Sequence, residues 1–231
     1  MRNMLAGLVL AALAGCSAGD QASAAPEKPD AAHRFLTALT EPPQKGPWHP
    51  RDECTSQPGA QAFREKLAAA VLARNADALA ALADEDIVLD FGGGHGVAEL
   101  KKRLGEPDRS LWSTLASLLP LGCAANPEGS LTMPWYFAQD IGVDEPYLGM
   151  IVRGVDVPVY AAPQAGAKPI AQLSWDAVEV QSDPAAFAKV KLRDGRTGYM
   201  EAAKLRAIVD YRLIADKRAG GWKLTAFVAG D

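Results

Sequence analysis

The chain has 231 residues, and its hydrophobic share of 48% is ordinary for a globular protein. That length is long for one domain and comfortable for two domains of about 100 residues each. The formal net charge of −4 at pH 7 argues against nucleic-acid binding, which needs a concentrated basic face.

Residues 1–15 have the pattern of a secretory signal peptide. Arg2 supplies an early positive charge, and the apolar run that follows ends near Ala14. This run is too short to span a bilayer, which needs about 20 residues. It ends in Leu-Ala-Gly-Cys16, which resembles the lipobox of bacterial lipoproteins, where cleavage precedes a cysteine that is then acylated. An ordinary signal peptide cleaved at a nearby alanine is the alternative.

The lipoprotein resemblance implies that Cys16 is lipidated and that the chain is anchored to a membrane of a bacterial cell envelope. Ser17 after the cysteine favours the periplasmic face of the outer membrane, by analogy with that family. Each buried methylene of an acyl chain contributes about 0.8 kcal/mol to anchoring. Residues 16–56 should form a tether and an irregular linker, with a short helix over 31–39.

Besides Cys16, the chain has only Cys54 and Cys123. In an oxidising compartment two such cysteines most simply form a disulfide, and the closed loop would contribute roughly 4 kcal/mol. A nucleophilic cysteine paired with His49 or His95 is the alternative, but neither cysteine lies in a recognised catalytic motif. The spacing of the histidines and cysteines indicates no metal site, and no cofactor motif is present.

Residues 57–148 have the pattern of an α+β domain. Asn75 and Ser110 are positioned to cap helices. Helical spacing covers 60–75, 76–83, 97–104 and 111–119, and short strands are expected at 87–91 and 131–140.

The glycine cluster at 92–96 follows the first expected strand. Its spacing fits neither the dinucleotide fingerprint nor the P-loop, so a turn with positive φ is favoured over a phosphate cradle. Asp90 as a general base with His95 as its partner is the catalytic alternative. The order helix, helix, strand, helix over about forty residues resembles the opening of the NTF2-like fold. That resemblance implies a cone-shaped domain with an internal pocket, which in some members carries isomerase or hydrolase activity.

Residues 149–206 predict a small β-barrel. Short alternating segments at 157–163, 169–175, 177–180 and 187–193 are broken by Pro and Gly residues. Asp194-Gly195 then lies before a strand around Tyr199, which is a strong hairpin signal.

Two segments of this region resemble bacterial SH3 (SH3b) domains. VPVYAAP at 157–163 is similar to their opening, and FAKVKLRDGRTGYM at 187–200 is similar to their close. The resemblance covers roughly fifty residues, with Phe187 where the family usually has Trp. It implies a non-catalytic, extracytoplasmic binding module, often tied to cell-wall peptides. Candidate ligand contacts are Tyr160, Trp175, Phe187 and Tyr199, with Asp194 and Arg196 as polar neighbours, although the same rings could fill a barrel core.

Residues 207–231 predict a β-hairpin with strands at 209–215 and 222–229 around a Gly-Gly turn. Its tail resembles the final strands of NTF2-like proteins. We therefore expect the hairpin to complete the domain of residues 57–148, with the barrel inserted between the two parts. A hairpin appended to the barrel is the alternative.

Together these features predict a lipid-anchored cell-envelope protein whose SH3-like module binds peptidoglycan or a peptide. One alternative is a small-molecule pocket or an isomerase or hydrolase activity in an NTF2-like domain. Another is a structural lipoprotein that binds a second envelope protein. No catalytic motif was found, so the sequence does not predict an enzyme.

Overall fold

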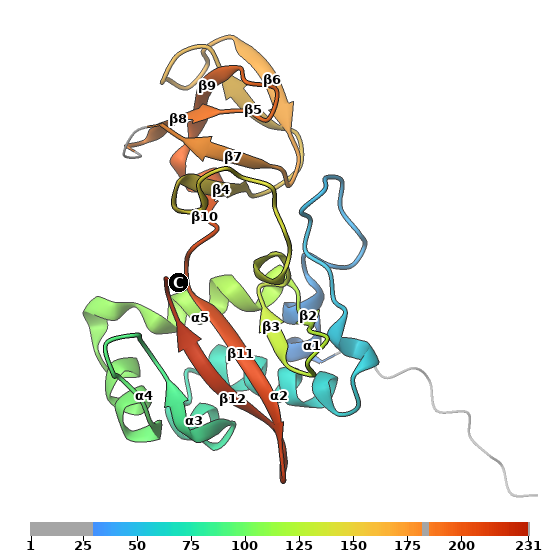
Figure 1. Cartoon of the computed structure of the whole chain (residues 1–231), viewed down its shortest axis with the longest axis vertical. Coiled ribbons are helices and arrows are strands. Elements are labelled where there is room, and N and C mark those ends of the chain that lie inside the picture. The colour runs from blue at the N-terminus through green and yellow to red at the C-terminus, as the bar shows by residue number, and fades with distance from the viewer. Residues whose placement is uncertain (1–29, 182–184, 231) are drawn as a thin grey trace, which may run out of the picture.

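The computed structural model describes residues 30–181 and 185–230, and the expected signal peptide, Cys16 and most of the tether lie outside this part. The described chain forms helices and two sheets, which confirms the α+β class. One sheet has the strand order β1-β12-β11-β3-β2, and the other has the order β10-β4-β7-β8-β9-β5-β6. Figure 1 shows the second sheet above the first, with the chain passing between them at two places.

The α-helices follow most of the predicted helical segments. Asn75 caps a helix as expected, because its side-chain oxygen accepts from the Ala78 amide at 3.0 Å. Ser110 also lies at the N-cap position of a helix, as expected, but its side chain makes no capping bond and its φ is 49°. The helices are α1 (Ala31–Thr37), α2 (Ala60–Leu72), α3 (Ala76–Ala81), α4 (Val97–Leu104) and α5 (Leu111–Leu118).

The first sheet joins segments from both ends of the described chain. Its strands are β1 (Ala83–Val88), β2 (Ala124–Ala125), β3 (Leu131–Met133), β11 (Arg212–Arg218) and β12 (Gly221–Val228). Strand β12 pairs with β1 in parallel, and β11 pairs with β3 in antiparallel. The C-terminal hairpin thus belongs to the sheet built by residues 83–133. We call this sheet and its helices the α+β unit.

Strands of the first sheet differ in their bounds from the sequence-based expectation. Strand β1 begins at Ala83 because it pairs with β12, and this pairing outweighs the weak strand propensity of its acidic residues. Strand β3 ends at Met133 because Pro134 has no amide to donate, and a 3-10 turn, η4 (Trp135–Ala138), follows. Strand β11 begins three residues later than expected, at Arg212, and continues to Arg218.

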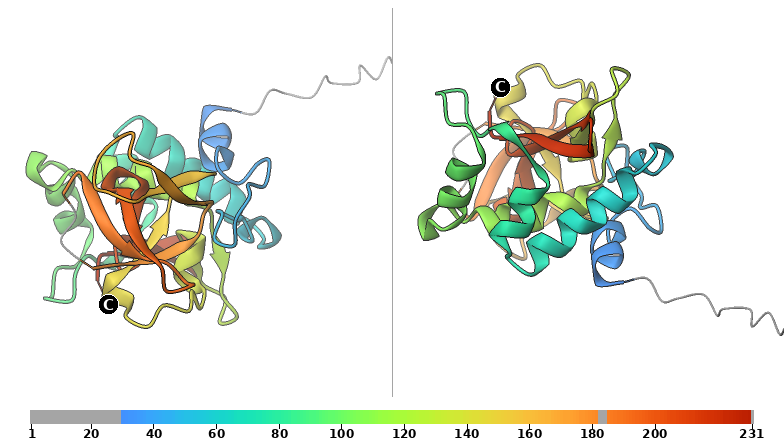
Figure 2. Two further views of the ribbon diagram at one scale, coloured as in Figure 1. Left: turned by 90° about the horizontal axis from the view of Figure 1, so that it is seen from above. Right: turned by 90° about the horizontal axis from the view of Figure 1, so that it is seen from below.

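The helices cover one face of the first sheet. Figure 2 shows them from below, running along one side of the C-terminal hairpin. Leucine and isoleucine side chains from both layers fill the space between, each contributing about 1.5–3 kcal/mol by burial. Fully buried examples are Leu67, Ile87, Leu115, Leu131 and Leu213.

The second sheet curls around a core of its own, and we call residues 149–207 the β unit (Figure 2). Its inward side chains alternate with outward ones, as period-2 strands require. Asp194-Gly195 forms the expected hairpin turn, in which the Leu192 amide donates to the Arg196 carbonyl at 2.8 Å. The strands are β4 (Gly149–Val152), β5 (Val157–Tyr160), β6 (Pro169–Leu173), β7 (Ala177–Val180), β8 (Phe187–Lys191), β9 (Thr197–Glu201) and β10 (Leu205–Ala207).

A third apolar cluster lies where the two units meet. Leu121, Trp135 and Tyr136 come from the α+β unit, whereas Ile151 and Trp175 come from the β unit. Burial raises the pKa of Tyr136 to about 12. The neutral hydroxyl accepts a hydrogen bond from Nε of an arginine in β10 at 2.8 Å. The two units therefore share a packed junction.

Residues 41–53, which we call the strap, leave the α+β unit after α1, contact the β unit and return to the α+β unit. The Trp48 amide donates to the Trp175 carbonyl at 2.8 Å, and Lys45 Nζ lies 2.7 Å from Asp156 Oδ1. Gly46 has a φ of 117°, and a Cβ there would overlap the Ser174 carbonyl oxygen, so only glycine fits this approach.

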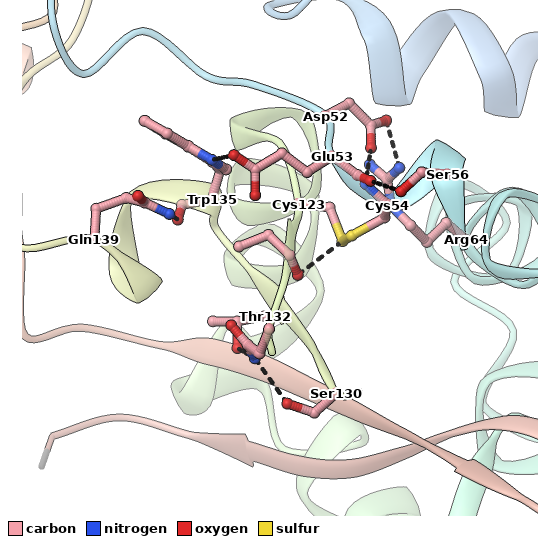
Figure 3. The surroundings of a disulfide bond; sticks show 12 residues. Asp52, Glu53, Cys54, Ser56, Arg64, Cys123, Ser130, Thr132, Trp135 and Gln139 are labelled. Atoms are coloured by element: carbon pink, nitrogen blue, oxygen red, sulfur yellow. Dashed lines mark hydrogen bonds and ion pairs between the residues drawn. A yellow bond between two sulfur atoms is a disulfide. The ribbon is translucent and has the colours of Figure 1, made fainter. Parts of the chain in front are cut away.

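The strap leads directly into a disulfide between Cys54 and Cys123, whose Cα atoms are 5.7 Å apart. Both cysteines are fully buried. The Glu53 amide donates to the Cys123 carbonyl at 2.9 Å, and Trp135 Nε1 donates to the Glu53 carboxylate at 2.7 Å (Figure 3). The expected disulfide is confirmed, and it fixes one end of the strap.

Candidate functional site

Three aromatic side chains share one outward face of the β unit. Ala188, Val190 and Met200 are fully buried, so the alternating positions on β8 and β9 point outward. Phe187 and Tyr199 occupy two of these positions, and Tyr160 of β5 lies opposite Tyr199 in the strand register. We call Tyr160, Phe187 and Tyr199 the aromatic face.

The rings of the aromatic face are packed but accessible. The Tyr160 and Phe187 centroids are 6.0 Å apart with an interplanar angle of 74°, an edge-to-face contact worth about 0.5–1.5 kcal/mol. All three residues are half-buried. Within the described residues, no group bonds to either tyrosine hydroxyl. The face therefore offers apolar surface and two free polar atoms to a ligand.

Trp175 does not belong to this face, and the prediction that it contacts a ligand is corrected. Its side chain is 2% exposed and packs in the junction between the two units. Its Nε1 donates to Gln44 Oε1 of the strap at 2.7 Å. Trp175 is a core residue that attaches the strap to the β unit.

Asp194 and Arg196 lie at the β8–β9 turn and bond mainly to each other. The Arg196 amide donates to Asp194 Oδ1 at 3.0 Å, and the guanidinium Nε donates to Oδ2 at 2.8 Å. These two contacts hold the pKa of Asp194 below its usual value. Arg196 also donates to the Ile170 carbonyl at 3.2 Å. Three residues of strand, about 10 Å, separate Arg196 from Tyr199, so this pair stabilises the turn and does not flank the rings.

Two charged residues that were not among the sequence-based candidates lie beside the aromatic face. Lys189 is opposite Tyr199 in the register of β8 and β9, and Glu201 is opposite Phe187. Strand alternation could have found both, because each is two residues from an outward aromatic side chain.

A pocket of about 280 Å³ lies where the linker into the β unit crosses β7 and β8. Its charged groups already have partners. Lys191 Nζ is 3.1 Å from Glu179 Oε2, and the Asp144 amide donates to Glu179 Oε1 at 3.0 Å. Lys191 is the main cause of the lowered pKa of Glu179. With these charges satisfied, the pocket offers a ligand less than the aromatic face does.

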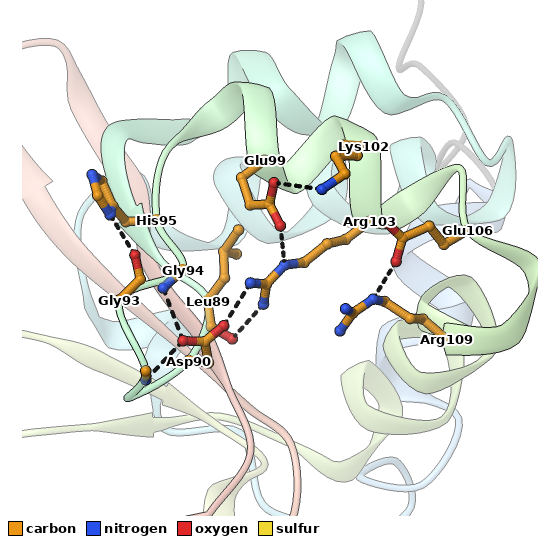
Figure 4. A network of polar contacts seen from close by, with 11 residues as sticks. Leu89, Asp90, Gly93, Gly94, His95, Glu99, Lys102, Arg103, Glu106 and Arg109 are labelled. Carbon is orange, nitrogen blue, oxygen red and sulfur yellow. Dashed lines mark hydrogen bonds and ion pairs between the residues drawn. The ribbon is translucent and has the colours of Figure 1, made fainter.

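The catalytic alternative at the glycine cluster does not match the observed contacts. Asp90 Oδ1 accepts from the Gly92 and Gly94 amides at 2.8 Å, and Asp90 Oδ2 accepts from Arg103 at 2.5 Å (Figure 4). The Gly94 amide and then Arg103 lower the pKa of Asp90, which makes it a weak base. His95 is exposed and bonds the Gly93 carbonyl at 2.8 Å instead of Asp90. The cluster is a turn closed by Asp90, as the spacing favoured.

Among the residues that the structure describes, no group of three or more His, Cys, Asp or Glu side chains could hold a metal ion. Across residues 30–181 and 185–230, no helix is long and apolar enough to cross a membrane. No family model matches the chain, and a search of curated proteins finds no match. The aromatic face of the β unit is therefore the strongest candidate for a functional site.

Proposed function

We propose that this protein is a lipid-anchored component of a bacterial cell envelope whose β unit is an SH3-like binding module for peptidoglycan or a peptide. It catalyses no reaction. The observation that carries this proposal is the aromatic face, where three rings from neighbouring strands stay half-buried and two hydroxyls stay free.

Such a face suits an extended peptide. Aromatic-lined grooves bind extended chains because the rings pack against side chains and the ordering cost of an already extended ligand is low. Burial of apolar surface contributes about 25 cal/mol per Å². The tyrosine hydroxyls add polar contacts to the backbone of the ligand.

Two observations support the location in the envelope. Cys16 follows a short apolar segment, as in lipoproteins, although this part lies outside the described residues. The buried Cys54–Cys123 disulfide is typical of proteins in an oxidising compartment such as the periplasm. The outer membrane is the proposed site of the anchor.

The strand pairing supports a proposal for the domains as well. We assign residues 57–148 and 207–231 to one NTF2-like domain and residues 149–206 to an inserted SH3-like barrel. In its favour, β11 and β12 pair with β3 and β1, not with strands of the β unit. Leucine side chains fill the space between the helices and the sheet, which does not favour an enzymatic pocket there.

Co-sedimentation with purified peptidoglycan tests the binding function. The protein would be the chain from Gln21, with its disulfide confirmed by mass. We expect it to be retained, and the Tyr160→Ala/Tyr199→Ala variant to remain in the supernatant. A Phe91→Ala/Tyr147→Ala variant is the matched control, because both of these aromatic residues are 62% exposed elsewhere. If the wild-type protein is not retained, intact peptidoglycan is not its ligand, and if both variants bind like it, the aromatic face is not the binding site.

A further inference from the structure

Most charged side chains on and around the β8–β9 hairpin are paired within the protein. Lys191 bonds Glu179 at 3.1 Å, and Arg193 Nε lies 3.2 Å from a carboxylate oxygen of the residue after Trp175. Asp194 and Arg196 pair across the turn at 2.8 Å. These pairs satisfy their own charges and leave none for a ligand.

Lys189 and Glu201 are the exceptions on this hairpin. Within the described residues, neither side chain makes an ion pair or a hydrogen bond. Lys189 is exposed and Glu201 is half-buried. The register puts Lys189 opposite Tyr199 and Glu201 opposite Phe187, so the two charges are diagonal neighbours, about 7–8 Å apart at the backbone. The unpaired charges of the hairpin thus lie among the rings of the aromatic face.

We infer that the aromatic face binds a zwitterionic peptide, whose carboxylate pairs with Lys189 and whose ammonium group pairs with Glu201. This inference rests on the proposed function and narrows its ligand class. In peptidoglycan it selects the stem peptides, which carry both carboxylates and amino groups. It does not select the glycan strands, because their amino groups are acetylated.

The surroundings of Lys189 and Glu201 favour a ligand that carries both signs of charge. The rings of Tyr160, Phe187 and Tyr199 exclude water once a ligand covers them, and this strengthens the electrostatic attraction between opposite charges. Hydrogen bonds between charged groups are then shorter and stronger than neutral ones. A ligand with only one sign of charge would satisfy one of the two groups and leave the other desolvated and unpaired.

The test measures the affinity of the chain from Gln21 for stem peptides released from purified peptidoglycan by an amidase. Lys189→Glu and Glu201→Lys should each weaken binding about tenfold, the lower end of what a hydrogen bond to a charged group contributes. Lys66→Glu and Glu85→Lys make the same changes in net charge at exposed sites of the α+β unit. We expect these two controls to bind like the wild-type protein.

Modified peptides identify which charge meets which residue. Amidation of the peptide carboxylates should weaken binding to the wild-type protein but not weaken it further in Lys189→Glu. Acetylation of the peptide amino groups should likewise weaken binding to the wild-type protein but not weaken it further in Glu201→Lys. Peptide-free glycan should not compete.

Two results would overturn the inference, and only the second of them would also overturn the proposed function. If both charge variants bind within twofold of the wild-type protein while Tyr160→Ala/Tyr199→Ala does not bind, the aromatic face is a binding site without charge selection, and the proposed function stands. If the wild-type protein binds neither intact peptidoglycan nor its stem peptides, the proposed function fails and the inference fails with it.

Discussion

Loss of the disulfide should destabilise this protein strongly. Cys54 and Cys123 are 69 residues apart, and the chain-entropy treatment of a loop of this length gives about 4 kcal/mol at 25 °C. Both cysteines are fully buried, so a Cys54→Ala/Cys123→Ala variant leaves only small voids where the sulfur atoms were. Most of the measured loss in the free energy of unfolding will therefore come from removal of the cross-link itself.

Thermal unfolding followed by circular dichroism measures this loss. For a chain of this size each kcal/mol lowers Tm by about 2–4 °C, so the variant should unfold roughly 8–16 °C below the wild-type protein. Hydrogen exchange adds a local readout, because the strap loses its fixed end. We expect the Trp48 amide to lose more protection than the Val190 amide in the core of the β unit. A Tm within about 3 °C of the wild-type value would refute this reasoning.

Three further changes test other parts of the structure. Gly46→Ala should cost at least about 2 kcal/mol in urea unfolding, because a Cβ would overlap the Ser174 carbonyl and φ is positive; an unchanged urea midpoint would contradict this packing. Tyr136→Phe should lower the free energy of unfolding by about 1–3 kcal/mol, since it leaves the buried Arg206 guanidinium without one acceptor; a neutral effect in the same assay would show that water replaces the hydroxyl. The folded-state pKa of Asp90 is depressed, so its stabilising effect is present above a pH of about 4 and is lost as pH falls through the folded value. Asp90→Asn should therefore lose stability less steeply between about pH 5 and pH 2 than the wild-type protein. Equal slopes of stability against pH would show that Asp90 does not contribute to this pH dependence.

Local signals in the sequence predicted local structure well. Asp194-Gly195 between alternating residues forms the hairpin turn, and Asn75 caps α3, because each depends only on neighbours within a few residues. Cys54 and Cys123 could be paired because only two cysteines remained after Cys16. In these cases the residue types and their positions in the sequence were enough to predict the turn, the cap and the disulfide.

Tertiary contacts decided what the sequence could not predict. Strand β1 starts at Ala83 because β12 is there to pair with it, and no pattern in residues 83–86 signals that pairing. Trp175 has the spacing of a strand aromatic residue, yet Gln44 and Trp48 of the strap cover it. Both contacts join residues far apart in the chain, so no local pattern reveals them.

The candidate site was predicted in part. The resemblance to SH3b domains suggested Tyr160, Phe187 and Tyr199 as ligand contacts, and the strand register brings these three residues to one face. Strand alternation predicts an outward Lys189, but its lack of an ion-pair partner depends on where every other charge lies. That property emerges only from the folded structure.

The most direct test of the binding site is to map backbone amide chemical shifts of the protein while stem peptides from purified peptidoglycan are added. We expect saturable shifts at Tyr160, Phe187, Lys189, Tyr199 and Glu201, and little change around the glycine cluster at 92–96. Shifts confined to the α+β unit or to the pocket beside Lys191, with the aromatic face unaffected, would contradict it.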